Sequence, residues 1–116
     1  MDKIKIGLIV NPISGFGGPL GLKGSDSDDI WDHVTDVYNL PSLKRTYDTL
    51  NNIDSKIADK IVFYTGSELL GEYLLKQFGF KFKIVYTSKI QRTSRSDTYK
   101  LLNEFKNQNI DLIVFA

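Results

Sequence analysis

The chain has 116 residues, 41% of them hydrophobic and 25% charged, a composition that is typical of a globular domain and excludes a disordered or collagen-like protein. Fifteen basic and fourteen acidic side chains give a net charge of +1, so we expect no strong attraction to nucleic acid or to an anionic membrane. The chain contains no cysteine, which excludes disulfides, thiolate metal sites and a thiol nucleophile.

The first half of the chain is predicted to alternate strand and helix. Residues 4–10 are almost all apolar and β-branched, as expected for a strand that is covered on both faces, and an Asn-Pro pair ends it. A glycine-rich loop occupies residues 14–24, and apolar residues at helical spacing predict a helix over residues 27–40. Pro41 breaks this helix, and a shorter helix is predicted over residues 42–50.

The second half continues the alternation. Strands are predicted at residues 61–64 and 82–86, separated by a helix over residues 67–78 that has a serine as its N-cap and a glycine after its last residue. A further helix is predicted over residues 96–108 and a last strand over residues 112–116. This order predicts an α/β fold, a three-layer α/β/α Rossmann-like domain with a parallel sheet of about four strands and right-handed crossovers. No linker or repeat divides the chain, so we expect a single domain.

The last five residues, 112–116, are all apolar. Chain termini are usually polar and lie at the surface, so we interpret the chain as cut short within a core strand. A core strand in this position predicts exposed apolar surface, and therefore dimerisation or poor solubility.

The glycine-rich loop carries the strongest functional signal, since it holds five of the nine glycines in the chain and directly follows the first strand. Ligands of open α/β sheets bind at the carboxyl ends of the strands, and glycines let backbone N–H groups approach a phosphate without obstruction. We predict a phosphate-binding loop; the alternative is a surface turn that binds no ligand. The residues assigned to the ligand are Asn11, Ser14, Gly15, Gly17, Gly18, Gly21 and Lys23.

Two common phosphate-binding motifs do not fit this loop. The P-loop requires Gly-Lys-Ser/Thr, whereas Lys23 follows a leucine and precedes a glycine. The dinucleotide fingerprint, started at Gly15, needs glycine or alanine where the chain has Leu20. A longer version that ends on Gly21 lacks an acidic residue at the end of the second strand. A standard dehydrogenase fold is therefore not expected.

The segments Gly7–Gly18 and Gly21–Asp26 closely resemble the opening of the ATP-NAD kinase-like family, which belongs to the superfamily of NAD kinases, diacylglycerol kinases and phosphofructokinase-like proteins. Weaker similarities follow along the chain. Residues 68–72 look like the family's Met-Gly-Glu region, residues 96–98 like its Asp-Thr pair, and residues 111–116 like the strand that leads into its Gly-Gly-Asp-Gly-Thr motif. The shared Asn-Pro-x-Ser/Ala-Gly element is represented here by Asn11, Pro12, Ser14 and Gly15.

The resemblance implies that residues 1–116 are the N-terminal α/β nucleotide-binding domain of a kinase, a transferase that moves a phosphoryl group from ATP or polyphosphate to NAD and gives NADP, with Mg²⁺. It adds Asp26 to the ligand-binding residues, while Ser27 replaces the family's usual glycine. The Gly-Gly-Asp-Gly-Thr motif, whose aspartate is the expected base, would begin after Ala116, and the second, β-rich domain is absent. No catalytic residue is therefore assigned, and the chain alone is expected to be inactive.

Two alternatives stay open. One keeps the kinase chemistry but changes the acceptor to a lipid or another small molecule, and the other is a non-catalytic nucleotide-binding or interaction module. The expected partners are a nucleotide or phosphate ligand and the missing C-terminal domain, and a homo-oligomer is also considered. No nucleic-acid or membrane partner is expected. No signal peptide and no apolar run of roughly 18–20 residues is present, which predicts a cytoplasmic protein.

Other polar residues are explained without chemistry. Asp28, Asp32 and Asp36 share one face of the predicted helix 27–40, but first-turn carboxylates are favoured by the helix dipole and no metal ligand is assigned. The single histidine, His33, is interpreted as an exposed helical residue. Asp97 is expected in the first turn of the helix 96–108, with a role in orienting a nucleotide as the alternative that the resemblance implies.

The charges of the second half also have two interpretations. Eight basic residues lie between Lys76 and Lys106, against only Asp97 and Glu104. We favour a solvated basic surface over a site for phosphates or for an acidic neighbouring domain.

Overall fold

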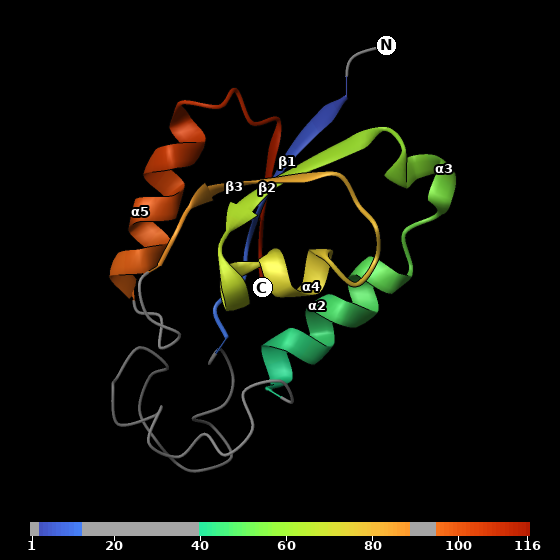
Figure 1. The fold of residues 1–116 in the computed structure, drawn as a ribbon, viewed down its shortest axis with the longest axis horizontal. Coiled ribbons are helices and arrows are strands. Elements are labelled where there is room, and N and C mark those ends of the chain that lie inside the picture. Colours follow the sequence, from blue (N-terminus) through green and yellow to red (C-terminus); the bar gives the residue numbers. More distant parts are fainter. Residues whose placement is uncertain (1–2, 13–39, 89–94) are drawn as a thin grey trace.

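The computed structural model describes residues 3–12, 40–88 and 95–116, and Figure 1 shows their arrangement. The predicted helix 27–40 and the glycine-rich loop beyond Pro12 lie outside these residues. The elements follow one another as β1 (Ile4–Ile9), α2 (Pro41–Asn51), α3 (Ser55–Ala58), β2 (Ile61–Gly66), the 3₁₀ helix η2 (Glu68–Leu70), α4 (Glu72–Leu75), β3 (Phe82–Tyr86), α5 (Arg95–Lys106) and β4 (Leu112–Phe115).

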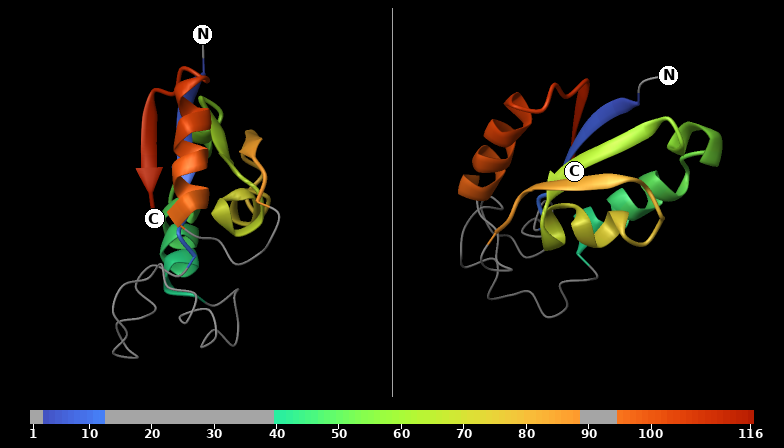
Figure 2. Two further views of the ribbon diagram at one scale, coloured as in Figure 1. Left: turned by 90° about the vertical axis from the view of Figure 1, so that its left-hand side faces the viewer. Right: turned by 45° about the horizontal axis from the view of Figure 1, so that its top comes forward.

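All four strands form one parallel sheet in the order β3-β2-β1-β4, so the predicted α/β class and the parallel sheet of four strands are confirmed. β1 lies in the interior of the sheet, where Ile6 is paired with Phe63 of β2 and with Leu112 of β4. β3 and β4 form the two edges (Figure 2, left). The continuous apolar run of β1 is explained by this interior position, because both faces of the strand are covered.

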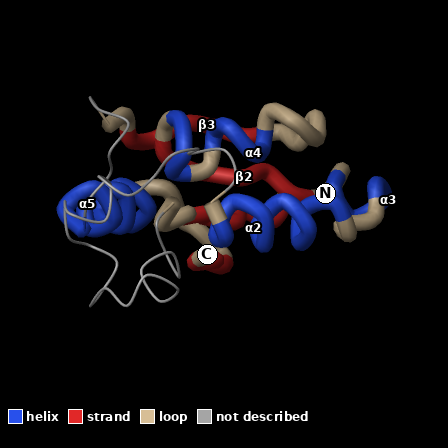
Figure 3. Tube along the Cα trace, turned by 90° about the horizontal axis from the view of Figure 1, so that it is seen from below, coloured by secondary structure: helices blue, strands red, loops and turns tan. Residues whose placement is uncertain are grey.

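Successive residues of β1 and β2 belong to two separate hydrophobic clusters. Leu8 and Phe63 pack with leucines of α2 and α4, whereas Ile9 and Tyr64 pack with Leu101 and Phe105 of α5. Figure 3 shows α5 on one side of the strands and α2 and α4 on the other. The connections from β1 to β2 and from β2 to β3 run toward the β3 edge of the sheet, whereas the connection from β3 to β4 runs to the β4 edge. Because each crossover is right-handed, this change of direction places α5 on the face opposite α2 and α4.

Most predicted elements recur with shifts of a few residues. β3 has the predicted bounds, and β2 extends two residues further, to Gly66. α2 begins at Pro41 rather than after it. A proline is tolerated there because the N–H that it lacks would have no partner within the helix. The four-residue helix α3 was not predicted. Within the described ranges, no helix has the length and apolar character needed to cross a membrane.

The single helix predicted over residues 67–78 is wrong. The segment is instead split into η2 and α4, with Gly71 between them. A Cβ atom on Gly71 would lie 1.9 Å from Oγ1 of Thr65, so the chain passes β2 more closely at this point than any other residue type allows. Thr65 is fully buried, and its hydroxyl lies 2.8 Å from the carbonyl oxygen of Leu8 and 3.2 Å from that of Leu70. These contacts tie the break in the helix to the centre of the sheet.

Candidate functional site

The carboxyl ends of the four strands meet at one end of the sheet, which is the region where the sequence predicts a ligand. The order β3-β2-β1-β4 reverses direction at β1, because β2 follows on one side of β1 and β4 is added on the other. In open α/β sheets, ligands bind in the crevice at such a reversal, outside the carboxyl ends of the two strands that flank it. Here these strands are β1 and β4.

The ends of β1 and β4 remain paired beyond the strands themselves. The N–H of Asn11 donates to the carbonyl of Ala116 at 2.7 Å, and the N–H of Ala116 donates to the carbonyl of Ile9 at 2.9 Å. These bonds place Asn11, which is half-buried, at the strand reversal. The other assigned residues, Ser14, Gly15, Gly17, Gly18, Gly21, Lys23 and Asp26, lie outside the described residues.

Helix α2 begins at the same end of the sheet as Asn11. The hydroxyl of Ser42 donates to the carbonyl of Pro12 at 2.8 Å, and both residues are fully buried. Ser42 was predicted to begin the helix, but α2 begins one residue earlier, at Pro41. The side chain of Ser42 does not cap α2 and instead bonds Pro12, which follows β1. The residue before the helix, Leu40, provides no side-chain cap for the first turn.

A set of hydrogen bonds joins the ends of β2 and β3 to the start of α5. The N–H of Ser67 donates to the carbonyl of Tyr86 at 2.9 Å, and the N–H of Ser88 donates to Oγ of Ser67 at 2.9 Å. The hydroxyl of Tyr86 donates to Oδ1 of Asp97 at 2.6 Å. Ser67 was predicted as a helix cap, but its hydroxyl instead fixes the segment after β3.

Asp97 lies in the first turn of α5, as predicted, and the bond to Tyr86 gives it a structural role that the sequence did not reveal. The two residues are eleven positions apart and belong to different elements, so no spacing rule connects them. Only the position of Tyr86 at the end of β3 and of Asp97 at the start of the next helix could have suggested the contact.

The Tyr86–Asp97 bond predicts a pH effect. The bond, burial and the charge of Asp97 raise the pKa of Tyr86 to about 12, from an ordinary value near 10. A phenol whose pKa is higher in the folded than in the unfolded state stabilises the fold fully below the unfolded pKa, and this contribution is lost as the pH rises from about 10 to about 12. We expect Asp97→Asn to move the pKa of Tyr86 back toward 10, measured by NMR titration of ring-labelled tyrosine. Tyr86→Phe identifies the resonance, and an unchanged titration in Asp97→Asn would contradict the bond.

Glu68 and Glu72 do not form a pair of carboxylates available for acid–base chemistry. The N–H of Glu68 donates to Oε1 of Glu72 at 2.9 Å, and Oε2 of Glu72 lies 3.1 Å from Nζ of Lys76. The hydrogen bond from the Glu68 backbone lowers the pKa of Glu72, and Lys76 adds to this effect against the opposing influence of burial. Glu72 is thus an ionised carboxylate that holds the turn between η2 and α4.

Neither a metal centre nor a focused basic site emerges from the described ranges. No three carboxylate or imidazole groups gather there in a way that could hold a metal ion. The basic residues of the second half that the structure describes are exposed and spread over different elements, in agreement with a solvated surface. They are Lys76, Lys81, Lys83, Lys100 and Lys106.

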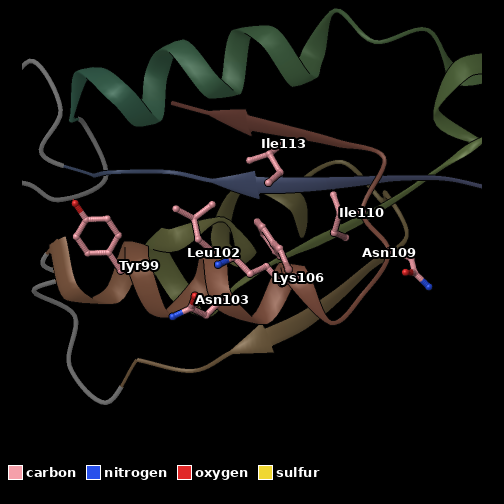
Figure 4. A pocket seen from close by; sticks show the side chains of 8 residues that line it. Tyr99, Leu102, Asn103, Lys106, Asn109, Ile110 and Ile113 are labelled. Atoms are coloured by element: carbon pink, nitrogen blue, oxygen red, sulfur yellow. The ribbon is translucent and has the colours of Figure 1, made fainter.

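Two cavities lie along β4 rather than at the strand ends. A cavity of about 590 Å³ separates α5 from β4 and is lined by residues that include Tyr99, Leu102 and Ile113 (Figure 4). A second one of about 320 Å³ lies on the other face, where Thr46 of α2 and Val114 of β4 contribute to its walls.

Comparison of the chain with protein-family profiles, with curated proteins and with solved structures found no match.

Proposed function

We propose that this chain is the N-terminal nucleotide-binding domain of a kinase similar to the ATP-NAD kinase-like proteins, and that it binds a nucleotide phosphate at the carboxyl ends of β1 and β4. The observation that carries the proposal is the strand order. β1 ends at the reversal between β1 and β4, where open α/β sheets bind their ligands, and the glycine-rich segment follows β1 in the sequence.

The surroundings of the reversal suit an anion. Helix α2 has eleven residues and begins beside the end of β1, where Ser42 bonds the carbonyl of Pro12. The N-terminus of a helix combines free N–H groups with a partial positive charge, which favours phosphate. Asn11 lies at the same end, and Lys23 of the following loop can add a full positive charge. Phosphoryl transfer relies on such positioning and charge neutralisation, and Mg²⁺, when bound, would supply further positive charge.

The acceptor in the proposed reaction is the 2′-hydroxyl of the adenosine ribose of NAD, with ATP or polyphosphate as donor. A lipid or another small molecule remains the second candidate, because the resemblance covers a superfamily with both kinds of acceptor. The printed sequence does not contain the Gly-Gly-Asp-Gly-Thr motif. We therefore expect the chain to bind nucleotide without converting NAD to NADP, and sustained NADP formation by the purified chain would contradict this assignment.

Nucleotide binding by the loop can be tested by calorimetric titration of ATP and of NAD, with Mg²⁺ present. We expect Lys23→Ala to weaken ATP binding roughly tenfold to a hundredfold, the loss of one charge-assisted hydrogen bond. Gly17→Val should weaken binding because its side chain blocks the approach of the backbone to the phosphate. Lys76→Ala is the matched control, since this lysine forms an ion pair on α4, and it should bind like the unaltered chain.

Each result of this titration has a clear meaning. Loss of binding in the two loop variants, with Lys76→Ala unchanged, supports the phosphate-binding loop. Binding that is equally strong in all three variants would place the ligand elsewhere. If neither ATP nor NAD binds the unaltered chain, the proposal is wrong, and an interaction module without nucleotide becomes the better description.

A further inference from the structure

β4 exposes large apolar side chains on both faces of the sheet. Leu112 and Phe115 are 55% and 60% exposed, and Ile113 and Val114 are 38% and 37% exposed. β1, at the centre of the same sheet, has its last residues almost completely buried. An apolar strand of this kind is typical of a position covered on both sides, so β4 has the composition of an interior strand at the edge of the sheet.

The outer edge of β4 is also open for hydrogen bonding. Both the N–H and the carbonyl of Ala116 bond β1, so the alternation along a strand directs the corresponding groups of Ile113 and Phe115 away from β1. No residue in the described ranges pairs with this side, and β4 carries none of the charges, prolines or bulges that usually protect an edge.

We propose that β4 pairs antiparallel with β4 of a second copy, so that two sheets join into one across a two-fold axis. The outward groups of Ile113 then bond those of Phe115 in the partner copy. Val114 of one copy lies opposite Val114 of the other, on the axis, in a non-hydrogen-bonded pair. Of the two-fold registers that join outward groups, this one gives both Ile113 and Phe115 a hydrogen-bonded partner within the strand.

A second copy is the occupant that matches β4 on both faces. A single helix could cover the cavity beside α5 or the one beside α2, but not both, because they lie on opposite faces of the sheet. A strand with apolar side chains on both faces extends both surfaces at once, and β4 of another copy is such a strand. Val114 then meets Val114, and Leu112 meets Ala116, of the partner copy on the α2 side, while Ile113 meets Phe115 of the partner copy on the α5 side.

The size of the surface indicates how tight the association should be. One short strand pair buries less than the roughly 800 Å² per partner of a standard interface, so the walls of both cavities must contribute as well. Tyr99, which lines the larger cavity and is 58% exposed, is placed to do so. We therefore expect a concentration-dependent dimer rather than an obligate one.

Cysteine cross-linking tests the register, and the chain offers a clean background because it contains no cysteine. In Val114→Cys, the two sulfurs face each other across a pair with Cα atoms about 4.5 Å apart, within the range for a disulfide. In Ile113→Cys, the two Cα atoms are about 8–9 Å apart, too far for a disulfide. The two side chains are equally exposed, so random collisions should link both variants alike.

We expect oxidised Val114→Cys to run as a covalent dimer and Ile113→Cys to remain mostly monomeric. Equal cross-linking of the two variants, or none in Val114→Cys, would overturn the proposed register.

Sedimentation velocity of the unaltered chain and of Ile113→Lys gives an independent test, with circular dichroism to confirm that both are folded. An edge lysine should abolish the dimer. A dimer that persists in Ile113→Lys, or an unaltered chain that stays monomeric at millimolar concentration, would exclude β4 as a self-association surface.

Discussion

Replacing Gly71 by alanine is expected to lower the free energy of unfolding by roughly 2–4 kcal/mol, one of the largest effects of any single methyl group in this chain. The new Cβ would lie 1.9 Å from Oγ1 of Thr65, and Thr65 cannot move aside because it is fully buried and bonds the carbonyl of Leu8. The chain between η2 and α4 must then move away from β2. Urea unfolding followed by circular dichroism measures the change.

Gly79→Ala is the control for this substitution. Gly79 has a φ of 72°, but a Cβ there meets nothing within 4 Å, so only the backbone cost of roughly 1 kcal/mol is expected. Removing the obstructing hydroxyl should recover part of the loss, so that Gly71→Ala combined with Thr65→Ala destabilises less than the sum of the two single variants. Strict additivity would show that the two residues do not conflict.

Phe105→Ala is expected to cost roughly 3–5 kcal/mol, the usual range for removing a buried aromatic ring. The ring is 2% exposed and belongs to the cluster that joins α5 to β1 and β2. It lies directly over Gly7, where a Cβ would be 2.6 Å from the ring. Because Gly7 has no side chain and alanine is much smaller than the ring, truncation leaves a cavity between α5 and the sheet. A fall in the urea midpoint with an unchanged slope is the expected measurement.

Tyr99→Ala is the matched control, since it removes an aromatic ring from the same helix. Tyr99 is 58% exposed, and its replacement should change the stability by no more than about 0.5 kcal/mol at concentrations where the chain is monomeric. A similar loss in both variants would show that the loss does not depend on the burial of the Phe105 ring.

Much of the fold was predictable because its signals are local. The apolar run of β1 and the turn residues around β3 each lie within one short window, and the alternation of strands with helices indicated a parallel sheet. The open surface of β4 was likewise expected from its composition. The pairing of β4 with β1 rather than with β3, which creates the strand reversal, does not follow from any of these windows.

The errors have a common physical cause, since they depend on contacts between distant residues. Leu70, Leu74 and Phe78 have the spacing of a helix face, but the close approach of Gly71 to Thr65 breaks the helix between them. The bond between Tyr86 and Asp97 has the same character. Of the predicted ligand residues, only Asn11 lies in the described part of the chain, and it lies at the strand reversal; the roles of the others stay predictions.

The position of β1 has a consequence for the order in which the chain folds. β1 leaves the ribosome well before β4, one of its two neighbours in the sheet, and the bond between Lys5 and Asp111 spans 106 positions. Closing so long a loop costs entropy before its contacts repay it. During synthesis β1, β2 and β3 can assemble with α2 and α4, while the second edge of β1 stays open. Until β4 arrives, that edge of the nascent chain presents unpaired backbone groups that another strand could pair with.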